Sequence, residues 1–229
     1  MNLLFDAPPC ATLPVTGSDR TFPVHRIYCV GKNYADHIRE MGLSTGPLRE
    51  EPCFFLKPGD VASSAETFTY PPGTSNLHYE GELVLAIGRG GRDISVAEAG
   101  DCILGYAAGL DMTRRDLQMA SSRLGLPWDT GKSFEQAAPI GSIRLREDVG
   151  ELESGSLRLW VNDELRQDGD LADLIWNCRE IVAKLSTLYT LQPGDLIFTG
   201  TPAGVGAVQK GDRIRLALAG LPELSVKVV

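Results

Sequence analysis

The chain has 229 residues, of which 43% are hydrophobic and 23% are charged, and its formal net charge at pH 7 is -8. These proportions are those of a soluble globular protein, and they exclude a disordered or fibrous chain. An acidic chain lacks the basic face that binds nucleic acid or an anionic membrane, so we expect neither partner. No stretch approaches the ~20 consecutive apolar residues of a membrane span. Composition and charge do not exclude an enzyme that acts on small molecules, including one that uses a metal cation.

The cysteines and the N-terminal segment bear on the cellular compartment. The five cysteines are widely spaced and form no CxxC motif, which predicts reduced thiols and excludes a disulfide framework or a zinc site. The segment MNLLFDAPPC has no basic start and an early pair of prolines, unlike a signal peptide. We therefore expect a cytoplasmic protein.

The first half of the chain alternates short apolar runs with turns. Residues 1–23 are rich in proline and are expected to form an N-terminal arm, followed by a single domain over 24–229. Apolar patterning then predicts strands at Arg26–Val30, Pro52–Lys57, Tyr79–Gly88 and Ile103–Leu110, and a helix at Tyr34–Met41 that ends at Gly42. A second helix is predicted over Thr113–Gly125, where Thr113 and Asp116 have the spacing of a capping box.

The second half is again dominated by strands. Apolar residues with a period of about 3.6 predict a helix at Leu171–Tyr189, with Asp170 as its N-cap. Strands are predicted at Ser156–Val161, Leu196–Thr199, Arg213–Leu218 and Leu224–Val228, with a turn at Asn162-Asp163. Because strands outnumber helices and do not alternate strictly with them, we expect an α+β fold that is mainly β, with mixed sheets and not a Rossmann-type sheet.

The usual signals of nucleotide binding and of a serine nucleophile are absent. Gly131-Lys132-Ser133 resembles the end of a P-loop, but that motif requires glycine at position 126, which is leucine. The turn over 200–206 lacks the GxGxxG spacing of a dinucleotide site, and the chain contains no GxSxG motif. We therefore expect neither a nucleotide cofactor nor a serine nucleophile.

Two glutamates at the start of a predicted strand form the sharpest local feature. Glu80 and Glu82 are two residues apart, so both side chains project from one face of the strand. Like charges side by side on a half-buried face are destabilising unless a cation lies between them, although an exposed face would also explain them. Asp111, at the end of another strand, offers a third carboxylate or a simple helix N-cap. Three carboxylates without imidazole describe an oxygen-only site for Mg²⁺, Mn²⁺ or Ca²⁺.

A histidine and a glutamate with helical spacing form the second feature. His37 and Glu40 are three residues apart, so on a helix Glu40 could orient the His37 ring for activation of a water molecule. A surface helix produces the same spacing by chance, and Lys132, in a turn-rich segment, is uninformative by itself. The local sequence leaves these alternatives open.

Taken together, the ordered segments resemble the fumarylacetoacetate hydrolase superfamily. The resemblance runs through VGKNYADHIREMG, EPCFFLKP, LHYEGELVLAIG, GLDMTRRDLQ, LPWDTGKSF and TGTPAGVG, and covers residues 26–228. Its short acylpyruvate and fumarylpyruvate hydrolases are the most similar members. The resemblance implies a mixed β-sandwich roll as a single catalytic domain, a homodimer, and a bound Mg²⁺ or Mn²⁺ ion.

The same resemblance implies roles for individual residues. It assigns the metal to Glu80, Glu82 and Asp111, the water-activating dyad to His37 and Glu40, and stabilisation of a developing enolate to Lys132. It places Arg115, Gln118 and Thr201 near the substrate. Lys32 stands where the family commonly has arginine, and lysine cannot make the bidentate contact with a carboxylate that arginine makes.

The activity implied is hydrolysis of the C–C bond of an acylpyruvate, such as fumarylpyruvate, to pyruvate and a second acid in the catabolism of aromatic compounds. The substrate is therefore expected to be a small keto or diketo acid. Similar sites in the superfamily decarboxylate oxaloacetate or isomerise hydroxymuconate-type acids, and these reactions are the alternatives. A non-catalytic binding protein that kept the fold is a further alternative, which the complete set of carboxylates, dyad and lysine argues against.

Overall fold

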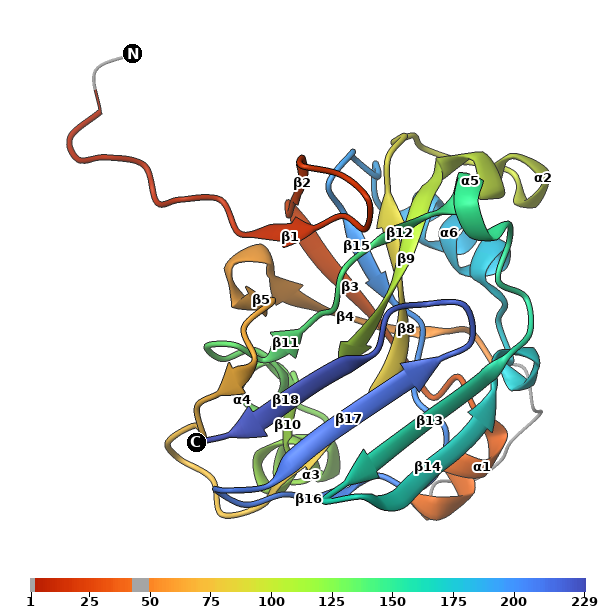
Figure 1. The fold of residues 1–229 in the computed structure, drawn as a ribbon. Helices are drawn as coiled ribbons and strands as arrows, with labels where there is room; N and C mark the ends of the chain where they lie inside the picture. The colour runs from red at the N-terminus through yellow and green to blue at the C-terminus, as the bar shows by residue number, and fades with distance from the viewer. Residues whose placement is uncertain (1–2, 43–49) are drawn as a thin grey trace.

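The computed structural model describes residues 3–42 and 50–229. Two mixed sheets face one another and contain most of the strand residues (Figure 1). The larger sheet has the strand order β12 (Arg144–Leu145), β9 (Ile103–Leu110), β8 (Gly81–Ile87), β15 (Leu196–Phe198), β3 (Arg26–Gly31) and β4 (Cys53–Pro58). The second has the order β14 (Glu164–Asp170), β13 (Ser156–Val161), β17 (Arg213–Leu218), β18 (Leu224–Val228) and β6 (Thr67–Phe68).

Smaller sheets and short helices complete the described part of the chain. The small sheets pair β1 (Thr12–Pro14) with β2 (Thr21–Pro23), β11 (Ala138–Pro139) with β5 (Ala62–Ser63), and β7 (Leu77–Tyr79) with both β10 (Thr113–Arg114) and β16 (Gly206–Ala207). The α-helices are α1 (Ala35–Glu40), α2 (Val96–Ala99), α3 (Arg115–Arg123), α4 (Asp129–Lys132), α5 (Arg146–Val149) and α6 (Cys178–Leu188). Single 3₁₀ turns are η1 (Gly59–Val61), η2 (Gly100–Cys102) and η3 (Leu171–Asp173). None of the helices in the described ranges is long and apolar enough to cross a membrane.

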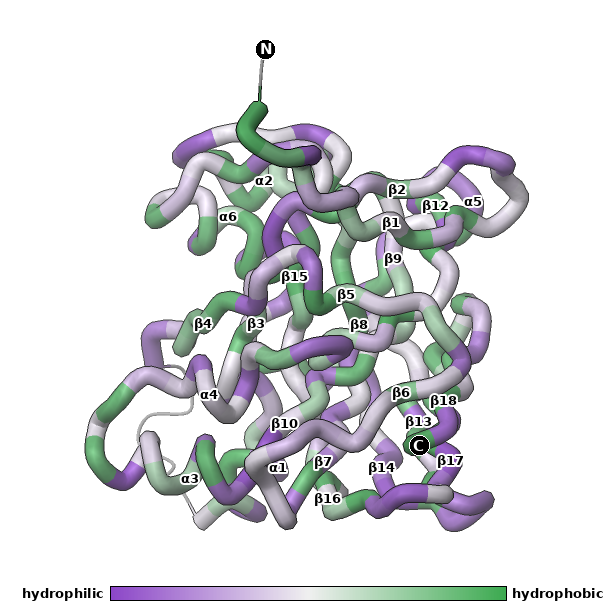
Figure 2. Tube along the Cα trace, turned by 90° about the vertical axis from the view of Figure 1, so that its left-hand side faces the viewer, coloured by the Kyte–Doolittle hydropathy of each residue, from purple (hydrophilic) through white to green (hydrophobic). Residues whose placement is uncertain are grey.

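The mainly β fold with mixed sheets is confirmed. β15 pairs in parallel with β3 but antiparallel with β8, so one sheet contains both pairings. β9, β13, β17 and β18 have the predicted bounds. Every residue of β8 is buried, which explains its continuous apolar run, and Figure 2 shows hydrophobic segments along these central strands.

The two sheets pack closely at Gly81. A Cβ atom at this position would lie 2.9 Å from Leu216 Cδ1 and 3.0 Å from Leu159 Cδ1, both on the second sheet. Such distances are too short for a side chain, so glycine lets the sheets approach at the point where Glu80 and Glu82 flank it. The carboxylates are thereby held against a rigid core.

The predicted strand Tyr79–Gly88 is wrong in one respect, because it is interrupted at Glu80. β7 ends at Tyr79 and pairs with β10 and β16, whereas β8 begins at Gly81 and belongs to the large sheet. A continuous apolar pattern does not reveal which neighbours a strand will pair with. The interruption places Glu80 between two sheets.

The helix predicted at Tyr34–Met41 is observed as α1, one residue shorter at each end, and the other two predicted helices differ more. The segment predicted as one helix over Leu171–Tyr189 divides into η3, capped by the Asp170 side chain, and α6, capped by Asn177 in a capping box with Glu180. Tertiary hydrogen bonds explain the division, since Ile175 N and Trp176 N donate to the backbone oxygen and side chain of Asn33.

The second correction concerns the start of α3. Thr113 lies in β10 opposite His78, and its hydroxyl donates to Asp111 O, so it does not cap the helix. Asp116 instead accepts hydrogen bonds from Thr74 and from the backbone N of Ser75 and Leu117. The predicted capping box is therefore wrong, because strand pairing and contacts with a distant loop take both side chains.

Candidate active site

Strand pairing brings three carboxylates together. β8 and β9 pair with Gly81 opposite Leu110, and Asp111 N donates to Glu80 O over 2.9 Å. Glu80, Glu82 and Asp111 are all buried, and each offers an oxygen within 4.8 Å of an oxygen of the other two. The register of two adjacent strands thus assembles the cluster that the sequence pattern suggested.

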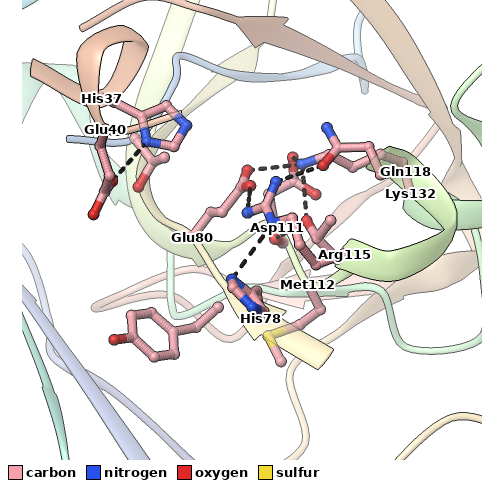
Figure 3. Close-up of polar contacts among 12 residues, drawn as sticks. His37, Glu40, His78, Glu80, Asp111, Met112, Arg115, Gln118 and Lys132 are labelled. Carbon is pink, nitrogen blue, oxygen red and sulfur yellow. Dashed lines mark hydrogen bonds and ion pairs between the residues drawn. The ribbon is translucent and has the colours of Figure 1, made fainter. Parts of the chain in front are cut away.

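Lys132 ties this cluster together. Its Nζ donates to Glu80 Oε2 and Asp111 Oδ2 over 2.7 Å each, and to Thr113 Oγ1 over 2.8 Å. The lysine is buried and ends α4, a short helix that packs against α3 and β10. Arg115 at the start of α3 adds a second cation, because its guanidinium donates to Glu80 (Figure 3).

The cations act unequally on the carboxylates. Burial opposes ionisation of Glu80, but Lys132 and Arg115 outweigh it and hold the pKa of Glu80 well below its usual range. Burial, followed by the charges of Asp111 and Glu80, raises the pKa of Glu82 well above its usual value. Glu82 has one backbone donor, Gly200 N at 2.6 Å. Glu82 therefore has a stronger need than Glu80 for an added positive charge.

The residues of the cluster fit a divalent cation. The buried Oδ1 of Asp111 makes no hydrogen bond with any described group, although Lys57 Nζ lies 2.9 Å away as an ion pair. An acceptor without a hydrogen-bond donor, a carboxylate with a raised pKa and an all-oxygen donor set match what Mg²⁺ and Mn²⁺ bind. A cation here would bind oxygens of these carboxylates and offset the repulsion between them.

The histidine–glutamate pair lies beside this cluster. His37 Nδ1 is 3.2 Å from Glu40 Oε2 on α1, as the spacing predicted. The other carboxylate oxygen of Glu40 accepts a hydrogen bond from Gly204 N over 3.0 Å. Figure 3 shows the second ring nitrogen of His37 turned away from Glu40, toward the side on which Glu80 and Asp111 lie. The ring is thus oriented, and its second nitrogen makes no hydrogen bond with any residue in the described ranges.

Gly204 is required where it supports Glu40. Its φ is +99°, and a Cβ there would lie 1.9 Å from the backbone oxygen of Arg166. Only glycine adopts this conformation at so close an approach. The glycine-rich turn therefore serves to position a carboxylate acceptor, a role that the TGTPAGVG segment did not reveal.

A cavity of about 290 Å³ connects these groups. Every residue named in advance as a site residue lines it, apart from Glu40: these are Lys32, His37, Glu80, Glu82, Asp111, Arg115, Gln118, Lys132 and Thr201. Glu40 lies behind His37 and reaches the cavity only through the imidazole ring. The structure therefore gathers segments from across the chain around one cavity.

Residues 26–229 match the family described as fumarylacetoacetate (FAA) hydrolase, C-terminal. The chain belongs to this family. It is similar to a fumarylpyruvate hydrolase from Ralstonia sp, with 49% identity over 189 residues that cover 82% of this chain and 98% of that protein. It is also similar to a mitochondrial oxaloacetate tautomerase from Bos taurus, with 41% identity covering 88% of this chain and 90% of that one.

A solved structure extends the similarity to the whole fold. The crystal structure of fumarylpyruvate hydrolase from Pseudomonas aeruginosa in complex with Mn²⁺ and pyruvate is 50% identical. It superposes with a TM-score of 0.96 and covers 100% of this chain and 99% of that chain. The resemblance to the fumarylacetoacetate hydrolase superfamily is therefore confirmed.

One buried cation of this family member was not identified as a site residue from the sequence. Lys57 on the edge strand β4 is 1% exposed, pairs with Asp111 and donates to the backbone oxygens of Met112 and Lys132. The sequence did contain a signal for this residue, because Lys57 ends an apolar run that predicts a buried strand. Lysine is almost never fully buried without a partner, so a lysine in such a strand indicates a buried polar or acidic partner. Lys57 adds a third positive charge around the carboxylates.

Gln167 is a second residue that the sequence did not indicate. Its side-chain amide accepts from Gly81 N over 2.9 Å and donates to Thr201 Oγ1 over 2.7 Å. The Thr201 hydroxyl donates in turn to Gly81 O over 2.9 Å. This network, from β14 on the second sheet, holds the backbone between Glu80 and Glu82 in place.

His78 is held as a neutral ring beside the cluster. Burial and the charge of Arg115 lower its pKa to about 4. Arg115 Nε donates to Nδ1 over 3.4 Å, so Nε2 carries the proton and donates to Asn76 Oδ1 over 3.0 Å. His78 is therefore uncharged, and its ring links Arg115 to the loop that contains Asn76 through two hydrogen bonds.

The neutral ring of His78 makes stability depend on pH. Its folded pKa lies below the ordinary value of 6.5, so its contribution is fully present above pH 6.5 and is lost as the pH falls toward 4. We expect the melting temperature of His78→Gln to fall less than that of the unmodified protein between pH 7 and pH 4.5, measured by differential scanning fluorimetry. If the melting temperatures of the two proteins fall in parallel with pH, the pKa of His78 is not lowered in the folded state.

Proposed function

We propose that the protein is a divalent-metal-dependent hydrolase that cleaves the C–C bond of an acylpyruvate, such as fumarylpyruvate, to pyruvate and a second acid. The observation that carries the proposal is the placement of an oriented His37 and a three-carboxylate cluster on one cavity. The similarity to a fumarylpyruvate hydrolase with bound Mn²⁺ and pyruvate supports it. Glu80, Glu82 and Asp111 would hold Mg²⁺ or Mn²⁺, which acts when bound as a Lewis acid on the carbonyl oxygens of the substrate.

His37 is proposed as the general base. With Nδ1 bound to Glu40, Nε2 is free to take a proton from water, whose oxygen then attacks the carbonyl carbon of the acyl group. The bond from that carbon to the methylene carbon of pyruvate breaks, and its electron pair forms the pyruvate enolate. The acyl group leaves as a carboxylic acid, and protonation of the enolate carbon gives pyruvate.

The buried cations stabilise the charge that develops. The Lys132 ammonium and the Arg115 guanidinium both lie within the cluster, at low dielectric, where fixed positive charge is most effective on a developing enolate oxygen. We propose that Lys32, Gln118 and Thr201, which also line the cavity, contact the substrate. The negative net charge of the chain makes these local cations necessary for an anionic substrate.

Product analysis tests this function. Acetylpyruvate, fumarylpyruvate and oxaloacetate are assayed side by side with Mg²⁺ and with Mn²⁺. Hydrolysis yields two acids, decarboxylation yields CO₂, and isomerisation conserves mass. Because a relative at 41% identity is an oxaloacetate tautomerase, keto–enol exchange of oxaloacetate is followed in the same assay as the competing activity. Turnover of oxaloacetate alone would overturn the hydrolase proposal.

We also propose that the enzyme is a cytoplasmic homodimer acting on small keto or diketo acids. The free thiols of all five cysteines support a reducing compartment. Light scattering coupled to size-exclusion chromatography measures the mass of the particle. A mass of one chain at micromolar concentration would overturn the dimer.

Metal binding should stabilise the fold measurably. A ligand that binds only the native state at 100 times its dissociation constant adds about 2.7 kcal/mol, which for a domain of this size shifts the melting temperature by roughly 5–10 °C. We expect this shift on adding Mn²⁺ to chelator-treated protein, and its reversal by the chelator. Asp111→Asn is the control, and an equal shift in that variant would place the ion elsewhere.

A further inference from the structure

One face of α3 forms a wall of the cavity from the carboxylate cluster to the rim. The α3 residues on this wall are Arg115, Gln118, Met119, Ser122 and Arg123. Spacings of three and four residues place such side chains on one helix face. Arg115 donates to Glu80 at the inner end, and Arg123 is the last residue of the helix at the outer end. The helix therefore runs the length of the cavity.

This wall has a defined length. At 1.5 Å per residue, Arg115 and Arg123 are about 12 Å apart along the helix axis. Helical side chains lean toward the N-terminus of their helix, a direction in which the long Arg123 side chain can extend along the wall. The end carboxyl carbons of extended fumarylpyruvate are six bonds apart, roughly 7–8 Å, so a distal carboxylate would lie nearer to Arg115 than the Arg123 backbone does, at a place that only the long Arg123 side chain could reach.

The charges of the cavity differ between its two ends. At the inner end, Lys132 and Arg115 are paired with carboxylates. Arg123, at the outer end of α3, and Lys32, which also lines the cavity, make no hydrogen bond or ion pair with any residue in the described ranges, and both are exposed. Among described residues, the only acidic side chains that line the cavity belong to the cluster. The outer end is therefore cationic and available to an anion.

The wall between the two ends is largely apolar. Ile38, Met41, Phe55, Met119 and Trp128 line it. Such a surface suits a hydrocarbon segment without polar groups. A ligand that fits the whole cavity is therefore anionic at both ends and apolar in the middle.

We propose that Arg123, with Lys32 from the connection after β3, binds the distal carboxylate of the acyl group and makes the enzyme selective for acylpyruvates that end in a carboxylate. The inference rests on the proposed function and specifies its substrate class. Arg123 is a specificity residue, because it contacts the end of the substrate remote from the reacting carbon. Lys32 supplies a second charge without the planar fork of arginine.

Steady-state kinetics with two substrates test the proposal. Fumarylpyruvate carries a distal carboxylate, and acetylpyruvate does not. For Arg123→Gln we expect kcat/KM for fumarylpyruvate to fall roughly tenfold, mainly through KM, since a rim contact to a charged group is lost. The double variant with Lys32→Gln should lose about a hundredfold, whereas kcat/KM for acetylpyruvate stays unchanged in Arg123→Gln. Arg123→Lys should restore part of the loss.

Arg20→Gln is the matched control, because Arg20 is also an exposed arginine, lies in the β1–β2 connection and does not line the cavity. It should leave both substrates unaffected. If Arg123→Gln retains the ratio of fumarylpyruvate to acetylpyruvate turnover, or loses both substrates equally, the inference is overturned and the proposed function stands. If the unmodified enzyme cleaves neither acylpyruvate, the proposed function itself fails.

Discussion

Replacing His37 by glutamine should lower kcat for acylpyruvate hydrolysis by about a thousandfold, in the range found for loss of a general base. Glutamine fills similar space but cannot accept the proton of water. KM should change little, because His37 acts on the attacking water and not on the carboxylates of the substrate. Initial rates with fumarylpyruvate at saturating Mn²⁺ measure the effect.

Glu40 allows the orienting role to be separated from the proton transfer. Glu40→Gln removes the charge and keeps one acceptor oxygen, which can serve either His37 Nδ1 or Gly204 N, whereas Glu40→Ala removes both contacts. We expect the alanine variant to lose more of kcat than the glutamine variant. His25→Gln is the control, since His25 pairs with Asp195 away from the cavity. Turnover near the unmodified level by His37→Gln would exclude the dyad.

Glu82→Gln should abolish hydrolysis while making the metal-free protein more stable. Glutamine replaces one of the three carboxylates proposed to hold the cation, so we expect at least a hundredfold loss of Mn²⁺ affinity, the upper end of what outer-sphere changes cause. In the metal-free protein, burial and the charges of Asp111 and Glu80 raise the pKa of Glu82. Its ionised form is therefore a source of strain that glutamine relieves, and the amide oxygen can still accept from Gly200 N.

The sign of the pH dependence follows from the raised pKa. Stability associated with protonated Glu82 is fully present below its unfolded pKa and is lost as the pH rises through the higher folded value. The melting temperature of chelator-treated Glu82→Gln should therefore exceed that of the unmodified protein by a margin that grows from pH 5 to pH 8. The exposed Glu135→Gln serves as the control. A variant that is less stable at every pH would show that Glu82 is not strained without metal.

Local spacing carried the parts of the site that lie within one element. Glu80 precedes β8 and Glu82 lies in it, and their separation of two residues still brings both carboxylates to one cluster. His37 and Glu40 share a helix face, because the helical period of 3.6, like the strand period of two, depends on the backbone alone. Four strands have their predicted bounds for the same reason. The break at Glu80 escaped prediction, since it results from β7 and β8 pairing with different neighbours.

Contacts between distant segments were beyond the reach of these patterns. Lys57 meets Asp111 across 54 residues, and Gly204 meets Glu40 across 164. Neither pair has a periodicity that relates its members. Asn33 likewise interrupts the helix predicted over Leu171–Tyr189, because it accepts hydrogen bonds from the backbone of Ile175 and Trp176. Helix propensity is a local property and does not include such tertiary contacts.

The residue types and short spacings of this sequence determined by themselves that carboxylates and an oriented histidine were available, and the ordered motifs indicated the family. The tertiary structure alone decided that they meet. It set the β8–β9 register that brings Asp111 beside Glu80, placed Lys57, Lys132 and Arg115 around them, and laid α3 along the cavity from Arg115 to Arg123. The physical reason is that the charge balance of a buried site is a sum over groups close in space, whereas sequence periodicity reports only neighbours along one element.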